Sequence, residues 1–231
     1  MKKRTAIIGA LVSLLPMGQP LVIGTGTVLT STAVMLSVPE KAQAESAKSI
    51  FNRGLSKRQS GDNYGAIKEF TRFIEEYPSN GNLSTAYYNR GNAKYKLKDY
   101  YGAIADYNKA IEINPRYDKA YYNRGNAKSD LKDYYGAIAD YSKAIEIDPR
   151  YAIAYLNRGF AKRKSGDNYA AIADYNKAIE INPNLSQAYV NRSVAKENKG
   201  DLKGACDDAR KAVSLGDQNQ KNKKWIRNNC Q

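Results

Sequence analysis

The chain has 231 residues and a formal net charge of +14 at pH 7, with no histidine and two cysteines. Without histidine the chain lacks the commonest general base and metal ligand, and two cysteines cannot form a structural zinc site by themselves. The sequence also shows no nucleophile–base arrangement and no phosphate-binding loop. These features exclude the common enzyme classes, and they predict a protein that uses no cofactor and no metal.

Residues 1–44 are predicted to be a signal peptide or an N-terminal membrane anchor. Residues 1–4 are basic, an apolar stretch covers 6–38, and 42–44 fit the small-x-small rule for signal peptidase. The uncharged stretch 21–38 is also close to the minimum length of a membrane span. Under both alternatives the body crosses the membrane, so we expect it in the periplasm or a comparable lumen, either free or anchored.

The body that follows is basic. Without residues 1–44 it has 33 basic and 22 acidic residues, a net charge of +11. Such an excess is compatible with nucleic acid, an anionic membrane surface or acidic proteins as partners. Export argues against nucleic acid, because it separates the body from the usual targets.

One unit recurs along the body. The sequence AYYNRGNAK stands at 86–94 and returns at 120–128, a separation of 34 residues. Units 84–117 and 118–151 differ at only six of 34 positions. A fixed period of this length is the signature of a stacked repeat. The five predicted units are 47–80, 84–117, 118–151, 152–185 and 186–219.

Each unit is expected to form two helices. In unit 84–117, apolar and small residues recur at helical spacing in two segments, and Asp99 between them is a plausible N-cap for the second. Asn114-Pro115 would end that second helix. Small residues such as Gly91 and Ala103 let the two helices approach closely. One unit cannot bury its apolar face alone, so the units must stack.

This pattern resembles the tetratricopeptide repeat (TPR) family from about Ala47 onward. The resemblance implies an all-α, right-handed solenoid of helix-turn-helix units that binds a protein or peptide and catalyses no reaction. The family's marker positions are occupied in three successive units by Tyr87, Gly91, Ala103, Tyr107, Ala110 and Pro115, by Tyr121, Gly125, Ala137, Tyr141, Ala144 and Pro149, and by Tyr155, Gly159, Ala171, Tyr175, Ala178 and Pro183.

An arginine stands in every unit where the family usually has an apolar residue, and an acid follows sixteen residues later. A guanidinium can hold a carboxylate through two hydrogen bonds, so we interpret these residues as structural ion pairs. A row of ligand-binding arginines is the alternative. Each unit also has a lysine one turn later, whose ammonium group we expect in water. The central pairs are Arg90–Asp106, Arg124–Asp140 and Arg158–Asp174.

An asparagine precedes each of these arginines. In the TPR family this position lines the concave groove, and the row resembles the asparagine ladder of the O-GlcNAc transferase repeats, which holds an extended peptide by its backbone. An asparagine amide offers a peptide unit both a donor and an acceptor. Capping of local backbone groups is the alternative. The row is Asn52, Asn89, Asn123, Asn157 and Asn191.

Neighbouring positions are predicted to complete the peptide groove, which is aromatic and amide-lined in the middle and apolar toward the C-terminal end. A carboxylate clamp of the chaperone-tail type is not expected, because its three basic positions hold Tyr88, Ile153 and Asn157. The additional groove residues are Tyr88, Tyr122, Asn92, Asn126 and Phe160.

Residues 217–231 are predicted to form a C-terminal capping helix with Asp217 as its N-cap. Cys206 lies at a core-facing position of the last unit, and Cys230 lies near the end of the cap. In an oxidising compartment we expect a Cys206–Cys230 disulfide that fastens the cap, with two reduced thiols as the alternative.

These patterns together predict a non-enzymatic scaffold that binds an extended peptide or partner segment, present as a monomer or weakly self-associating. The alternative function is electrostatic binding of nucleic acid or an anionic membrane surface through the basic excess.

Overall fold

The computed structural model describes residues 40–230, which contain eleven helices and no strands. The predicted signal or anchor segment therefore lies outside the described residues, apart from its last five positions. Among the described helices, none combines the length and the apolar character needed to cross a membrane. The helices are α1 (Glu40–Gln59), α2 (Asn63–Glu76), α3 (Leu83–Lys96), α4 (Tyr100–Ile113), α5 (Asp118–Asp130), α6 (Tyr134–Ile147), α7 (Ala152–Lys164), α8 (Asn168–Ile181), α9 (Ser186–Glu197), α10 (Leu202–Ser214) and α11 (Gln220–Asn229).

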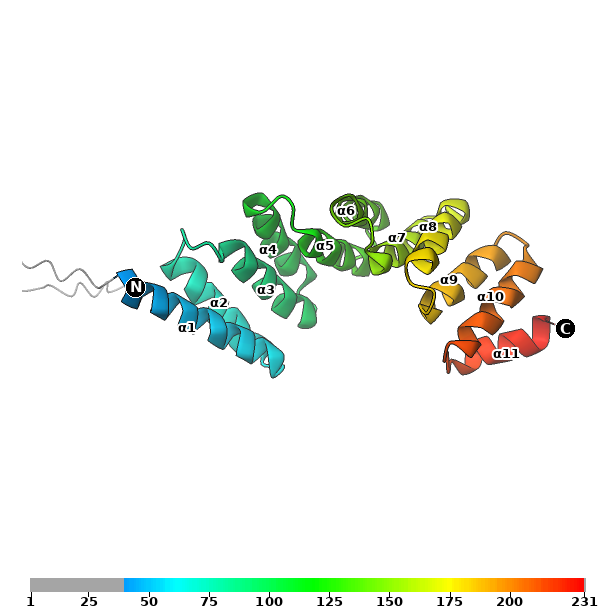
Figure 1. Cartoon of the computed structure of the whole chain (residues 1–231), viewed down its shortest axis with the longest axis horizontal. Helices are drawn as coiled ribbons and strands as arrows, with labels where there is room; N and C mark the ends of the chain where they lie inside the picture. Colours follow the sequence, from blue (N-terminus) through cyan, green and yellow to red (C-terminus); the bar gives the residue numbers. More distant parts are fainter. Residues whose placement is uncertain (1–39, 231) are drawn as a thin grey trace, which may run out of the picture. The chain divides into compact units, whose positions relative to one another are not determined.

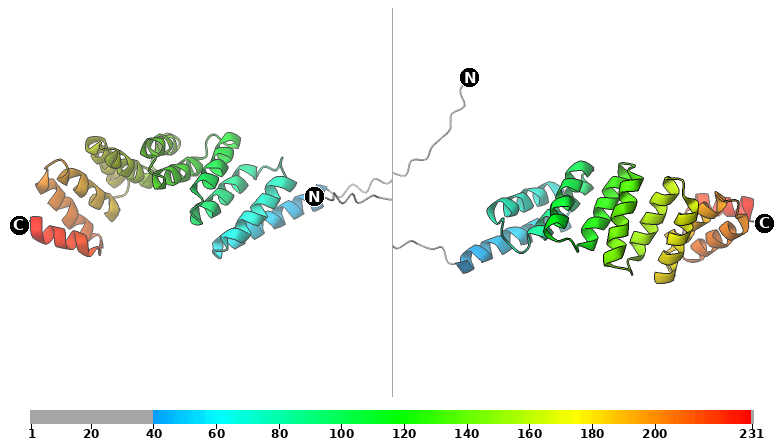
Figure 2. Two further views of the ribbon diagram at one scale, coloured as in Figure 1. Left: turned by 180° about the vertical axis from the view of Figure 1, so that it is seen from behind. Right: turned by 90° about the horizontal axis from the view of Figure 1, so that it is seen from above.

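The helices are arranged as consecutive pairs, and the all-α solenoid predicted from the sequence is confirmed. Each first helix packs on the second helix of its own unit, and each second helix packs on the first helix of the next unit. Figure 1 shows this order from α1 to α11, and Figure 2 shows successive pairs side by side in other views. Successive first helices also contact one another, α1 with α3, α3 with α5, α5 with α7 and α7 with α9. The first helices therefore form one continuous row.

Aspartate residues start the second helices. In every unit an aspartate precedes the second helix, and its side chain accepts a hydrogen bond from the backbone N–H three residues later. The prediction for Asp99 is confirmed, since it accepts from the Gly102 N–H at 2.9 Å. This bond satisfies a backbone donor that has no partner within the helix. Asn114 is the C-cap of α4, as Asn114-Pro115 predicted.

A large ring fills the space between the two helices of each of the first four units. Tyr107, Tyr141 and Tyr175 are fully buried or nearly so. A Cβ added to Gly91 would lie 2.8 Å from the Tyr107 ring, and Gly125 has the same relation to Tyr141. The absence of a side chain on these glycines therefore gives the ring its place.

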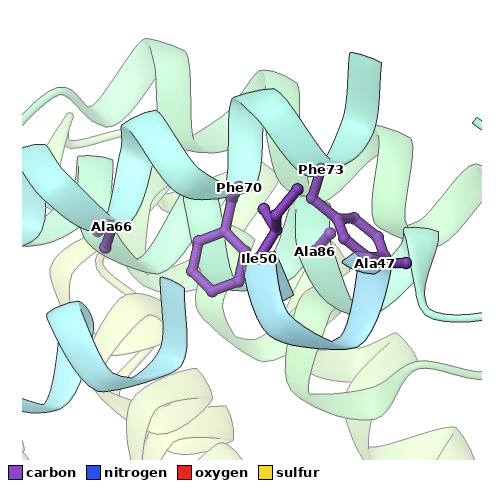
Figure 3. Close-up of a cluster of buried hydrophobic side chains, with 7 residues drawn as sticks. Ala47, Ile50, Ala66, Phe70, Phe73 and Ala86 are labelled. Atoms are coloured by element: carbon purple, nitrogen blue, oxygen red, sulfur yellow. The ribbon is translucent and has the colours of Figure 1, made fainter. Parts of the chain in front are cut away.

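The first unit builds its core with phenylalanine instead. Figure 3 shows Phe70 and Phe73 of α2 beside Ile50 of α1. Ala86 of α3 belongs to the same buried cluster, so the core continues from one unit into the next.

The C-terminal cap differs from its prediction in where it begins. The helix starts at Gln220 with Asn219 as its N-cap, and the Asn219 side chain accepts from the Lys221 N–H. Asp217 was expected in this role, but it accepts from the Asn219 N–H and from the Asn222 side chain. Its carboxylate therefore holds the turn that leads into the helix.

The contact between Gly91 and Tyr107 predicts a specific sensitivity. Gly91→Val should destabilise the fold by about 1–3 kcal/mol, because the added atoms overpack a filled core. Urea unfolding followed by circular dichroism measures this change. Gly81→Val is the control, because a Cβ at Gly81 meets no atom within 4 Å. Equal midpoints for the two variants would contradict the assigned role of Gly91.

Candidate functional site

The repeated arginines and aspartates lie in contact, and each pair spans two helices of one unit. Arg90 of α3 donates to both carboxylate oxygens of Asp106 of α4, at 2.9 Å from Nε and 2.7 Å from Nη2. The same geometry recurs in the pairs Arg124–Asp140, Arg158–Asp174 and Arg192–Asp208. The aspartates are buried. These arginines therefore bind protein carboxylates and do not form a ligand-facing row.

Each of these arginines also reaches the preceding unit. Arg90 Nη1 donates to Thr71 on α2, and Arg124 Nη1 donates to Asn108 on α4. The guanidinium groups of Arg90 and Arg124 further stack over tyrosines of their own helices, at 5.3 Å from the ring centroid. One side chain therefore fixes both the pairing of helices within a unit and the contact between units.

The repeated lysines were expected to extend into water, and this expectation is wrong for four of the five. Lys94 Nζ lies 2.8 Å from Asp106 Oδ2, and its side chain is 21% exposed. The equivalent contacts are Lys128–Asp140, Lys162–Asp174 and Lys196–Asp208. Each buried aspartate thus binds two cations, which gives it more partners than a simple pair would.

The first unit shows a weaker version of this cluster. Its acid is Glu69, which contacts Arg53 through a single bond of 3.2 Å. Lys57 pairs with Asp62 instead. The longer glutamate and the more exposed arginine make this end of the array less tightly held.

A second network links tyrosines and asparagines of successive units. Tyr107 donates its hydroxyl hydrogen to Asn92 Oδ1 at 2.8 Å, and Asn123 of the next unit donates to the same oxygen at 2.8 Å. Asn123 donates its other amide hydrogen to the Tyr88 hydroxyl at 3.1 Å. One asparagine of the predicted ladder is therefore bound by the preceding unit.

The network repeats one unit later. Tyr141 donates to Asn126 Oδ1, and Asn157 donates to both Asn126 Oδ1 and the Tyr122 hydroxyl. Burial raises the pKa of Tyr122, while Asn126 and Asn157 lower it. The amide nitrogens of Asn123 and Asn157 are occupied in this way, and their carbonyl oxygens accept no hydrogen bond from the described residues.

The other members of the predicted asparagine row lie in different surroundings. Asn89 is 4% exposed and donates to the Thr85 carbonyl, so it does not line the groove. Asn52 is exposed on α1. Asn191 accepts from Gln187 on its own helix. The row is therefore not one uniform ladder, because its neighbours change from unit to unit.

Phe160 and Leu156 end the network toward the C-terminus. They occupy the positions that Asn126 and Tyr122 hold in the preceding unit. Tyr175, the equivalent of Tyr141, consequently has a buried hydroxyl without a hydrogen-bond partner among the described residues. Burial raises the pKa of Tyr175 to about 12, against the opposing effect of the nearby Arg163 guanidinium.

Two cavities follow one another along the row of first helices, and they share Tyr95 and Asn126. The N-terminal cavity has a volume of about 390 Å³ and the C-terminal cavity one of about 350 Å³. The N-terminal cavity is lined by Arg58, Asn63, Tyr88, Asn92, Tyr95, Lys96, Asn123 and Asn126. The C-terminal cavity is lined by Tyr95, Asn126, Ser129, Asp130, Tyr141, Leu156, Asn157, Phe160, Gln187 and Asn191. We call the two together the groove.

Tyr95 and Asp130 lie where the two cavities meet. The Tyr95 hydroxyl donates to Asp130 Oδ2 at 2.5 Å, which joins α3 to α5. Burial and this carboxylate raise the pKa of Tyr95 well above its usual value. Tyr95, Asp130, Arg58 and Lys96 could not be singled out from the sequence, because none of them recurs in more than one other unit.

The two cysteines lie at bonding distance. Cys206 of α10 and Cys230 after α11 form a disulfide with a Cα–Cα distance of 5.5 Å. Trp225 of α11 donates its indole N–H to Glu197 of α9 at 2.8 Å. No residue of α11 is buried, so these few contacts hold the cap in place.

Among the described residues, no group of three or more histidine, cysteine, aspartate or glutamate side chains is placed to hold a metal ion. The groove instead offers amide, hydroxyl and aromatic groups, which suit non-covalent contact with another chain.

Family models place the units in a known repeat. Models described as "Tetratricopeptide repeat" match residues 48–80, 84–117, 118–151 and 152–185, which together make up more than half of the chain. No curated protein matches the sequence.

Solved structures show the same fold. A MamA protein is 26% identical with a TM-score of 0.68, covering 77% of this chain and 96% of its own. YrrB, described as a TPR protein with an unusual peptide-binding site, is 18% identical with a TM-score of 0.68, covering 80% of this chain and 98% of its own. PilF of Pseudomonas aeruginosa is 17% identical with a TM-score of 0.68, covering 78% of this chain and 81% of its own.

The buried carboxylate should matter far more than an exposed one. Asp140→Asn leaves two cations close together without their anion and should destabilise the fold by about 3–5 kcal/mol. Glu146→Gln is the matched control, since it breaks the exposed Lys143–Glu146 pair and should cost about 0–1 kcal/mol. Urea unfolding of both variants measures the difference, and similar losses would refute the role of the cluster.

The tyrosine hydroxyls should also differ between units. Tyr107→Phe removes a hydrogen bond to Asn92 and leaves its oxygen with one donor fewer, at a cost of about 1–2 kcal/mol. Tyr175→Phe removes a hydroxyl that has no hydrogen-bond partner among the described residues, so the free energy of unfolding should stay unchanged or rise. Thermal and urea unfolding test this contrast, and an equal loss in both variants would show that Tyr175 has a hydrogen-bond partner in solution.

Proposed function

This chain belongs to the tetratricopeptide repeat family of protein-interaction scaffolds, and we propose that it binds an extended peptide or partner segment in its groove. The observation that carries the proposal is the pair of adjoining cavities along the first helices, lined mainly by amide and aromatic side chains. The two cavities share Tyr95 and Asn126 as lining residues, so they adjoin along the first helices.

The hydrogen-bonding capacity left in the groove fits a peptide backbone. Asn92 and Asn126 have their oxygens occupied and keep their amide N–H groups. Asn123 and Asn157 have their nitrogens occupied and keep their oxygens. Donors and acceptors from successive units can therefore bind the C=O and N–H groups of one extended chain. This differs from the predicted asparagine row. The free amide donors belong to Asn92 and Asn126, which lie outside that row, and the row itself contributes acceptors.

The peptide-binding site described for YrrB supports the same class of ligand for a related fold. The C-terminal cavity adds Leu156 and Phe160, which give an apolar side chain of the ligand a place to bind. Recognition would thus combine backbone contacts of low sequence preference with one apolar position.

Export of the body remains part of the proposal. The basic and apolar residues 1–44 support a signal peptide or anchor. The disulfide between Cys206 and Cys230 suits an oxidising compartment.

The basic excess gives weaker support to nucleic acid or membrane binding. The repeated arginines and lysines are largely bound to aspartates of their own unit, as in the Arg90–Lys94–Asp106 cluster. Because carboxylates of the same unit neutralise these cations, fewer positive charges are available to bind an anionic surface.

Selection of random peptides displayed on phage against the full chain tests the proposal. We expect selected peptides to lose at least about tenfold in affinity for the double variant Phe160→Ala/Asn191→Ala, because both residues line the C-terminal cavity. Isothermal titration calorimetry measures the affinity, and circular dichroism verifies that the variant is folded.

The matched control is Ile113→Ala/Asn228→Ala, which changes the same kinds of residue at exposed positions outside the groove. It should leave the affinity unchanged. Failure to select any peptide, or equal affinity for both double variants, would contradict binding in the groove.

A further inference from the structure

The N-terminal cavity carries charge that backbone binding does not require. Its charged lining residues are Arg58 and Lys96, and both are cations. Neither forms an ion pair within residues 40–230, whereas Lys57 and Lys94 on the same two helices both do. The cavity therefore presents positive charge that no carboxylate of the described chain neutralises.

Arg58 provides a second observation. Its Nε atom is buried and has no hydrogen-bond partner among the described residues. The buried Nε atom is out of reach of a ligand, as it is in the equivalent Arg163. The terminal nitrogens of Arg58 also form no hydrogen bond with the described residues, and a bound group can supply the acceptor that they lack. Since Arg58 also lines the cavity, an acceptor bound there lies within reach of its guanidinium group.

The orientation of two amides points to the same kind of ligand. Asn92 Oδ1 accepts from both the Tyr107 hydroxyl and Asn123 Nδ2, each at 2.8 Å. Turning this amide over would set its NH₂ group against the NH₂ group of Asn123, so in this network the NH₂ group of Asn92 is the free end. Asn126 is held in the same way by Tyr141 and Asn157. Both amides line the cavity and offer it donors.

The acid that lines the groove lies in the neighbouring cavity. Asp130 lines the C-terminal cavity and not the N-terminal one. Its carboxylate accepts from the Tyr95 hydroxyl at the boundary between the two. Two cations, two fixed amide donors and no lining carboxylate make the N-terminal cavity complementary to an anion.

We propose that the N-terminal cavity binds a carboxylate of the peptide, with Arg58 and Lys96 supplying charge and Asn92 and Asn126 supplying neutral donors. This rests on the proposed function and adds the ligand class, a peptide with an acidic group at this place. The site differs from a chaperone-tail clamp, whose basic positions hold Tyr88, Ile153 and Asn157 here.

The C-terminal cavity determines which ligand side chain can bind near the acidic group of the peptide. Leu156 and Phe160 line the C-terminal cavity, and the two cavities adjoin at Tyr95 and Asn126. The ligand therefore combines an acidic group with an apolar side chain a few residues away, and selected peptides should show both.

Matched synthetic peptides test the carboxylate. Each selected peptide is made with its Asp or Glu side chains, with Asn or Gln in their place, and with a free or an amidated C-terminus. We expect loss of the bound carboxylate to lower the affinity about tenfold, because a charge-assisted hydrogen bond is lost. Loss on side-chain replacement identifies an acidic side chain, and loss on amidation identifies the chain end.

Protein variants show which cations are responsible. Arg58→Gln and Lys96→Gln should each lower the affinity for the acidic peptide by a larger factor than the affinity for the uncharged peptide. Lys68→Gln is the control, because it removes the same charge from an exposed position of α2 that does not line the cavity. It should leave both affinities as they are.

The outcomes separate this inference from the proposed function. If no peptide is selected by the wild-type chain, both ideas fail. If peptides bind in the groove but acidic and uncharged forms bind equally, only the carboxylate site is overturned. An effect of Lys68→Gln equal to that of Arg58→Gln would likewise overturn it, because long-range charge and not the cavity would then explain the preference.

Discussion

The stacking of this array depends on a buried carboxylate held by two cations. Asp106 and its equivalents in the next three units lie on the second helices, and the arginine and lysine that hold them lie one turn apart on the first. The arginine continues to the second helix of the preceding unit. A charge buried in this way must keep all its partners, so the helices can shift little relative to one another. This constraint sets the regular spacing of the first helices, which carry most of the groove residues.

The tyrosines connect the core to the groove. Tyr107 and Tyr141 fill the space beside glycines with their rings, and their hydroxyls reach the asparagines that line the cavities. Core packing therefore places a hydroxyl group against one end of each of these amides. A residue that looks purely structural in the repeat pattern thus determines the hydrogen-bonding character of the surface.

The chemical character of the groove depends on residues that differ between the units. Phe160 and Leu156 interrupt the network that Asn126 and Tyr122 continue, and Arg58 and Lys96 occur without equivalents of the same charge in every unit. Identical units would give one uniform surface with no preferred register for a ligand. The differences produce a polar, cationic cavity beside a more apolar one.

The sequence by itself determined the fold, because the 34-residue period, the helical spacing and the aspartate caps all act locally or between adjacent units. It also indicated the acidic partner of each repeated arginine, since their separation of sixteen residues is the same in every unit. Only the tertiary structure decided which asparagines face the groove and where the lysines bind. Asn89 is buried while Asn92 lines a cavity, although both lie on α3 only three residues apart. Asn92 is held at the cavity by Tyr107 and by Asn123 of the following unit, and these contacts depend on how two helices and two units meet in space.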